Sequence, residues 1–74
     1  MNDKERAWLD DVFEYHAPTA DQVVIYAKLR GDAKAFASTV IEHCPPSADR
    51  SATLRLIREA VMTANASVAL AGRG

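Results

Sequence analysis

The sequence is poor in cysteine, in excess basic charge and in long apolar runs, and each shortage excludes a class of protein. Cys44 is the only cysteine, so no disulfide can form within the chain. The two histidines and the scattered carboxylates show no CxxC or HxxxH spacing, so they make no zinc pattern. Nine basic and ten acidic residues give a net charge of −1, whereas duplex-DNA binders usually carry a large basic excess.

Membrane proteins and enzymes are also disfavoured. The first residues are charged and no apolar stretch could cross a bilayer, so we expect no signal peptide, no membrane partner and a cytoplasmic protein. There is no glycine-rich phosphate loop and no nucleophile elbow. Asp10 and Asp11 are adjacent, so on a helix they would point about 100° apart and could not act as a carboxylate pair. We expect them to be solvated helix charges, Cys44 to be a buried thiol, and the chain to need no metal or cofactor.

The length of 74 residues predicts a single helical domain over residues 1–74 that is marginally stable by itself. Domains of this size usually depend on disulfides, metals or partner subunits. Because the sequence has no pattern for the first two, we expect self-association.

Three helices are predicted from apolar periodicity and capping signals. The first covers about residues 3–14, with Asp3 as its N-cap. The second covers about residues 20–43 and begins at a capping box formed by Thr19 and Gln22. The third covers about residues 47–71, begins at Ser47 after two prolines and stops at Gly72.

The two longer helices are predicted to pair as an antiparallel hairpin, because their apolar residues recur at spacings of three and four. The predicted facing residues are Gln22, Tyr26, Leu29, Ala33, Phe36 and Val40 on one helix and Leu54, Ile57, Val61, Ala64 and Val68 on the other. The residues predicted to lie alongside these stripes are Ile25, Ala37, Ile41 and Cys44 on the first helix and Ala60 and Ala71 on the second. The residues predicted to form a second face between subunits are Val23, Val24, Met62 and Leu70. The expected fold is therefore all-α: a short N-terminal helix, then an antiparallel hairpin of two long helices, assembling into a compact homo-oligomer.

The strongest hint of function is an aromatic residue on a short elbow before the second helix. Pro18 breaks the helical pattern, so Tyr15 is poorly placed for core packing and well placed to cover a flat group. The ring either folds back on the hairpin or stacks on a nucleobase. Arg30, about 15 Å along the second helix, is either one exposed arginine among six or a group that binds a phosphate or base. Tyr15 and Arg30 are more readily brought together between two chains than within one.

Four sequence elements follow one another in a specific order. They are Tyr15-His16-x-Pro18-x-x-x-Gln22, then Tyr26 with Leu29-Arg30, then Glu42-x-Cys44-Pro45-Pro46-Ser47, then Glu59-Ala60-Val61-Met62-x-Ala64-Asn65-Ala66. Together they resemble the small phage-encoded anti-CBASS protein 2 family over about residues 8–70. The resemblance implies a compact homohexamer that binds cyclic dinucleotides such as 3′,3′-cGAMP between protomers without cleaving them. It also implies that some members bind cyclic trinucleotides in separate pockets.

The resemblance also implies site residues. The family's base-stacking tyrosine corresponds to Tyr15, and its cationic residue on the following helix corresponds to Arg30. Further ligand-binding candidates are His16, Tyr26, Lys34, Asn65 and Arg73. The chain departs from the family near Leu70, where relatives commonly carry an arginine. Arg73 is expected to replace that arginine in a trinucleotide pocket only if the helix continues past Gly72.

The role implied by the resemblance is sequestration of second messengers made by bacterial cyclases during phage infection, in the cytoplasm of the infected host. Sequestration keeps the host effector inactive and blocks CBASS antiviral signalling. Two other functions stay open. The hairpin could be a protein-interaction module that binds a partner helix through its alanine-rich face, without a nucleotide ligand. A phosphodiesterase ranks third, because the sequence offers neither a metal cluster nor a general base.

Overall fold

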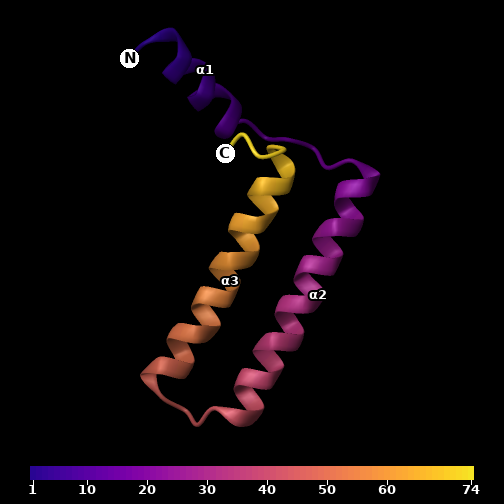
Figure 1. Cartoon of the computed structure of the whole chain (residues 1–74), viewed down its shortest axis with the longest axis vertical. Helices are drawn as coiled ribbons and strands as arrows, with labels where there is room; N and C mark the ends of the chain where they lie inside the picture. Colours follow the sequence, from indigo (N-terminus) through magenta and orange to yellow (C-terminus); the bar gives the residue numbers. More distant parts are fainter.

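The computed structural model describes all 74 residues and contains three helices and no strand (Figure 1). Helix α1 spans Asp3–Val12, α2 spans Ala20–His43 and α3 spans Ala48–Ala69. Helices α2 and α3 form an antiparallel hairpin, and α1 extends away from the end where α2 begins and α3 ends (Figure 1). The predicted all-α hairpin after a short N-terminal helix is therefore confirmed. The predicted bounds match α2 and run slightly too long for α1 and α3.

Side-chain caps explain where α2 and α3 begin. The predicted capping box at the start of α2 is confirmed: Thr19 N–H donates to the Gln22 side chain at 3.0 Å, and Gln22 N–H donates to the Thr19 hydroxyl at 3.2 Å. The Ser47 hydroxyl accepts a hydrogen bond from Arg50 N–H at 3.1 Å and so caps α3. Both arrangements satisfy backbone donors that the first helical turn leaves unpaired.

The N-cap of α1 is Asn2, so the predicted cap at Asp3 is wrong. The Asn2 side chain accepts from Glu5 N–H at 2.7 Å, and the Glu5 carboxylate accepts from Asn2 N–H at 3.0 Å. Asn2 and Asp3 are both good capping residues, and only Asn2 has a glutamate at the position that completes the box. Asp3 lies in the first turn instead, where its charge favours the positive end of the helix dipole.

Helices α2 and α3 contact each other largely through the predicted stripes. The half-buried or buried residues that the prediction placed on this contact are Gln22, Tyr26, Leu29, Ala33, Val40, Leu54, Ile57, Val61, Ala64 and Val68. The Gln22 amide also donates to the Val68 carbonyl at 3.2 Å, which ties the first turn of α2 to the end of α3. The prediction for Phe36 is wrong, since its side chain is 57% exposed, whereas Ala37, which was predicted to lie alongside the stripe, is half-buried. A methyl group at that position lets the two helices approach more closely than a phenyl ring would.

Two further residues differ from their predicted environment. Leu70, predicted on a second face between subunits, is one of only two buried residues, with Val40, each 5% exposed. It is buried because the chain turns back after α3, where Arg73 N–H donates to the Leu70 carbonyl at 3.0 Å. Cys44, predicted to be buried, is exposed because it is the C-cap of α2 and begins the loop that leads to α3.

The end of α3 is a Schellman turn centred on an unusual residue. Gly72 N–H donates to the Ser67 carbonyl at 3.0 Å and Ala71 N–H donates to the Val68 carbonyl at 3.2 Å. Ala71 takes the left-handed conformation, with φ 48°, which glycine usually supplies at this position. The helix therefore ends before Gly72, which itself has φ 80°.

We expect Ala71→Gly to raise the free energy of unfolding by about 0.5–1 kcal/mol. The left-handed conformation costs an L-residue roughly 1–2 kcal/mol, which glycine avoids. The larger conformational entropy of glycine in the unfolded chain offsets part of this gain. Urea unfolding followed by circular dichroism measures the change. Ala66→Gly is the matched control. Because Ala66 is exposed inside α3, this substitution should lower the free energy of unfolding by about 1 kcal/mol. Equal destabilisation by both substitutions would contradict the role of the left-handed cap.

The protomer is thin and extended for its length. Its dimensions are 50 × 31 × 15 Å and its radius of gyration is 16.0 Å, whereas a compact domain of this length has about 11 Å. Its accessible surface is 5859 Å², whereas a folded monomer of this mass exposes about 4,500 Å². Helix α1 does not pack on the hairpin, since α2 and α3 are the only helices in contact. Much of the apolar surface is therefore uncovered within one chain.

Candidate ligand-binding site

Tyr15 lies on the elbow between α1 and α2, with its side chain 83% exposed and without a hydrogen bond. Hydrogen bonds toward α1 and toward α2 fix the backbone of the elbow on either side of Tyr15. The Thr19–Gln22 capping box fixes its end at α2. On the α1 side, His16 Nε2 lies 2.6 Å from the Asp11 carbonyl oxygen, so the ring nitrogen donates to that oxygen. The alternative of a ring folded back on the hairpin is wrong, and the faces of Tyr15 are available to a ligand.

Asp11 connects this elbow to the C-terminal end of the chain. Its carboxylate accepts two hydrogen bonds from the Arg73 guanidinium, from Nε at 2.7 Å and from Nη2 at 3.0 Å. His16 Nε2 lies 3.5 Å from the same carboxylate. The prediction that Asp11 is a free, solvated helix charge is therefore wrong, because the turn after α3 brings Arg73 beside it. The condition for Arg73 to serve a trinucleotide pocket is not met, since α3 ends at Ala69.

This ion pair shifts the pKa of both groups in the direction that favours their charged forms. Hydrogen bonds from Arg73 lower the pKa of Asp11 against the opposing effect of desolvation, and the Asp11 carboxylate raises the pKa of Arg73. Because the Asp11 pKa is lowered, the pair is fully formed above the ordinary pKa of an aspartate. It is lost as the pH falls through the lowered value.

Arg30 is exposed in the middle of α2, at the edge of a shallow, open hollow of about 330 Å³. The hollow, which we call the arginine hollow, lies between α2 and α3. Its lining residues are Arg30, Ala33, Ala37, Ile57, Arg58, Val61 and Met62. Neither Arg30 nor Arg58 forms a salt bridge. Two unpaired guanidinium groups beside an apolar floor suit a ligand that has both phosphates and flat bases.

Arg58 is not among the residues predicted from the sequence. The signal for it was present: Arg58 directly follows Ile57, which faces α2, so Arg58 has to lie at the edge of that contact. Its proximity to Arg30 depends on the relative rotation of the two helices, which periodicity alone leaves open.

The other predicted site residues lie apart from the arginine hollow. Tyr26 and Asn65 are half-buried on the hairpin, and Lys34 is exposed on α2. The Asn65 Oδ1 atom is buried without a hydrogen-bond partner. Tyr15 lines none of the surface hollows and Arg30 lines the arginine hollow, so no hollow of the protomer is lined by both residues.

A larger hollow of about 520 Å³, which we call the apolar groove, also runs between α2 and α3. It is lined by Leu29, Asp32, Ala33, Phe36, Thr53, Leu56, Ile57, Ala60, Val61 and Ala64. Phe36 and Leu56 are its large exposed side chains. Gly31 lies next to this region, and a Cβ atom built there would meet nothing within 4 Å. A backbone or ligand that packs closely against Gly31 would therefore have to come from outside the protomer.

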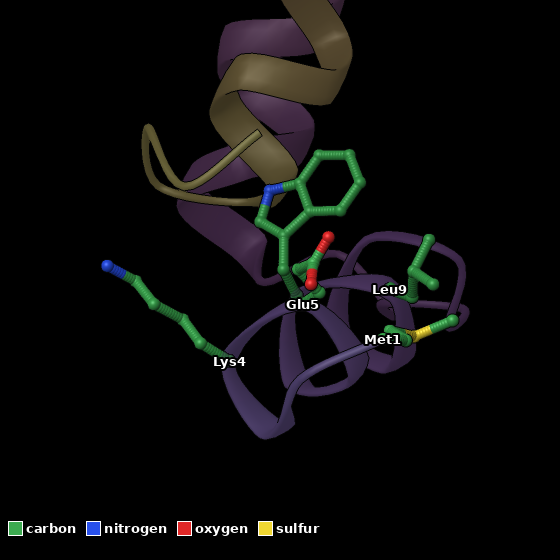
Figure 2. Close-up of a pocket in the computed structure, with 5 residues that line it drawn as sticks. Met1, Lys4, Glu5 and Leu9 are labelled. Carbon is green, nitrogen blue, oxygen red and sulfur yellow. The ribbon is translucent and has the colours of Figure 1, made fainter.

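The most spacious hollow, of about 600 Å³, lies on α1 and holds none of the predicted site residues. Figure 2 shows Met1 and Leu9 on one side of the helix and the Lys4 side chain extending away from them. Trp8 and Glu5 complete the lining. Because α1 and Met1, two residues before it, supply every lining side chain, this hollow is an open flank and not an enclosing site.

The structure holds no cluster of three or more histidine, cysteine, aspartate or glutamate side chains that could bind a metal ion. No helix combines the length and the apolar character that crossing a membrane requires.

Comparison with known proteins assigns the family. The family model described as "Acb2/Tad1, hairpin domain" matches residues 9–69. Neither the curated proteins nor the solved structures gave a match. The matched stretch begins inside α1, contains the elbow with Tyr15 and ends with α3, so it covers the whole hairpin. The match confirms the resemblance to anti-CBASS protein 2, and the chain belongs to the Acb2/Tad1 hairpin-domain family.

Proposed function

We propose that the protein is a sponge that binds a cyclic dinucleotide, such as 3′,3′-cGAMP, between protomers and holds it without cleaving it. Membership of the Acb2/Tad1 family favours a cyclic-oligonucleotide sponge. The observation that carries the proposal in this chain is the Tyr15 ring, 83% exposed on an elbow that is held on both sides. Because contacts on both sides hold the elbow, its backbone loses less freedom when the ring stacks, and stacking contributes about 1–3 kcal/mol per base.

The proposed site lies on a two-fold axis between two protomers. A cyclic dinucleotide has two bases and two phosphates in nearly two-fold symmetric positions, so it matches a site built from two copies of one surface. Each protomer supplies Tyr15 for a base and Arg30, with Arg58 beside it, for a phosphate. Guanidinium groups suit this task because they donate paired hydrogen bonds to phosphate oxygens.

The partner of each protomer in this proposal is another copy of the chain, in the homohexamer that the family resemblance implies. One protomer exposes about 1,400 Å² more surface than a compact monomer of its mass. A standard interface covers about 800 Å² per partner, so this excess is enough for more than one contact. The apolar groove with Phe36 and Leu56 is the surface best suited to such a contact.

The end of α3 supports a preference for cyclic dinucleotides over cyclic trinucleotides. Leu70 is buried where relatives commonly carry an arginine, and Arg73 is bound to Asp11. The arginine that a trinucleotide pocket would use is therefore engaged elsewhere in this chain. We propose cyclic dinucleotides as the main ligands, held in the cytoplasm of the infected bacterium so that CBASS signalling stays blocked. Slow release of an enclosed ligand would make the sequestration effective.

A thermal unfolding series with cyclic nucleotides tests this function. At 100 times its dissociation constant, 3′,3′-cGAMP should add about 2.7 kcal/mol to the free energy of unfolding and raise the melting temperature. The linear dinucleotide with the same two bases is the matched control and should shift the transition much less. Chromatography after denaturation should recover the cyclic ligand intact. Recovery of a linear product would point to a phosphodiesterase instead.

A protein-interaction module is the second candidate, because the apolar groove is open and could hold a partner helix. The same series separates the two functions. No shift in the melting temperature with any cyclic dinucleotide or trinucleotide would contradict the sponge and favour the module.

A further inference from the structure

We propose that Asp11 is a positioning residue for Tyr15, and that it acts by fastening α1 and the elbow to the turn after α3. The fastening itself is independent of any ligand. Its consequence for ligand binding rests on the proposed function.

Helix α1 has few other means of attachment to the rest of the chain. It does not pack on α2 or α3. A helix from Asp3 to Val12 is also too short to be stable by itself in water. The contacts of the Asp11 carboxylate with Arg73 and His16, and the hydrogen bond from His16 to the Asp11 main-chain carbonyl, are the only hydrogen bonds or salt bridges that join α1 to residues from His16 onward. The order of α1 and of the residues next to it therefore depends on Asp11.

The geometry connects these contacts to Tyr15. The Arg73 guanidinium holds the Asp11 carboxylate from a position 62 residues away in the sequence. The Asp11 carbonyl oxygen holds the ring of His16, the neighbour of Tyr15, at 2.6 Å. In Figure 1 the C-terminus lies beside the end of α1 and the start of the elbow. The contacts of one aspartate thus define the direction in which the elbow leaves α1, and with it the place of the tyrosine ring.

The charges around Asp11 predict which solution conditions should weaken its contacts with Arg73 and His16. The groups that face its carboxylate are the Arg73 guanidinium and the His16 ring. Arg73 and Asp11 both remain partly exposed to water, so salt should screen their attraction. Higher ionic strength should loosen α1 and the elbow while leaving the apolar hairpin contact unchanged.

Hydrogen exchange measured by mass spectrometry on the assembled protein tests the fastening without a ligand. Asp11→Asn and Arg73→Ala should each speed the exchange of α1 amides severalfold, with α2 and α3 unchanged as internal controls. The exchanged pair Asp11→Arg with Arg73→Asp should restore slow exchange. Raising salt from about 0.05 M to about 0.5 M should speed α1 exchange in the unmodified protein and not in Arg73→Ala. Unaltered α1 exchange in both single variants would overturn the proposal.

Calorimetry with 3′,3′-cGAMP then tests the consequence for Tyr15. Asp11→Asn should weaken binding about threefold to tenfold, since the elbow must be ordered when the ligand binds, and the exchanged pair should restore it. Equal affinity of Asp11→Asn and the unmodified protein would overturn the positioning role. Failure of the unmodified protein to bind would overturn the proposed function instead, and hydrogen exchange would still decide whether the fastening exists.

Discussion

Replacing Tyr15 with alanine should abolish sequestration of cyclic dinucleotides while the helices and the assembly remain. The ring makes no hydrogen bond and is 83% exposed, so its loss removes little packing within the protomer. In the proposed site two copies of the ring each stack on a base, at about 1–3 kcal/mol per base. Losing both should raise the dissociation constant by roughly 30-fold to 10⁴-fold. Isothermal titration calorimetry measures the change, and light scattering checks that the mass is unaltered.

Matched variants isolate the role of this ring. Phe13→Ala removes another exposed aromatic side chain, 79% exposed and close by in the sequence, and should leave the affinity unchanged. Tyr15→Phe keeps the stacking surface and should bind within a fewfold of the unmodified protein. Arg30→Ala should weaken binding by about 1.5–3 kcal/mol per lost charged hydrogen bond. Affinities of Tyr15→Ala and Arg30→Ala that equal the original would show that the ligand binds elsewhere.

Placing a carboxylate in the apolar groove with Phe36→Asp should break the assembly and unfold most of the chain. Burying an unpaired charge against another subunit costs several kcal/mol per ion. The separated protomer has little to compensate, since it buries only two residues. Folding and assembly are therefore expected to be coupled, so stability should rise with protein concentration. Light scattering for the mass and circular dichroism for the helix content, over a dilution series, measure both effects.

Ser38→Asp is the control for this experiment. Ser38 is exposed on the same helix and lines none of the hollows, so the same new charge should be tolerated there. If Phe36→Asp kept both the mass and the melting curve of the unmodified protein, the groove would not be an interface. An unmodified protein that is monomeric and fully folded at all concentrations would contradict the coupling itself.

Local chemistry explains what could be predicted from this sequence. Capping by Thr19 and Ser47 and the breaks at the prolines depend on neighbouring residues, so the helices of the hairpin could be placed correctly. Periodicity placed both Phe36 and Ala37 near the inner face and could not tell which is the more covered. Consecutive residues differ by about 100° around a helix, and the partner helix decides between them.

The contacts around the candidate site were harder to predict, because they join distant parts of the chain. Tyr15 could be identified from the proline elbow and the family resemblance. The pairing of Asp11 with Arg73 spans 62 residues and follows no periodic pattern. It depends on the turn at Ala71, where a non-glycine residue takes the left-handed conformation. The position of Arg58 beside Arg30 likewise depends on how α3 is rotated against α2.

The small core of the protomer also bears on how the protein accumulates in a cell. With two of 74 residues buried, an unassembled chain spends much of its time open to proteases, whose rate of cleavage follows the open population. In the proposed homohexamer, assembly would compete with degradation, and its rate would rise steeply with the concentration of newly made chains. Halving the rate of synthesis would lower the amount of finished protein by more than half. The strength and timing of expression would thus control the yield of working protein as strongly as any residue in the binding site.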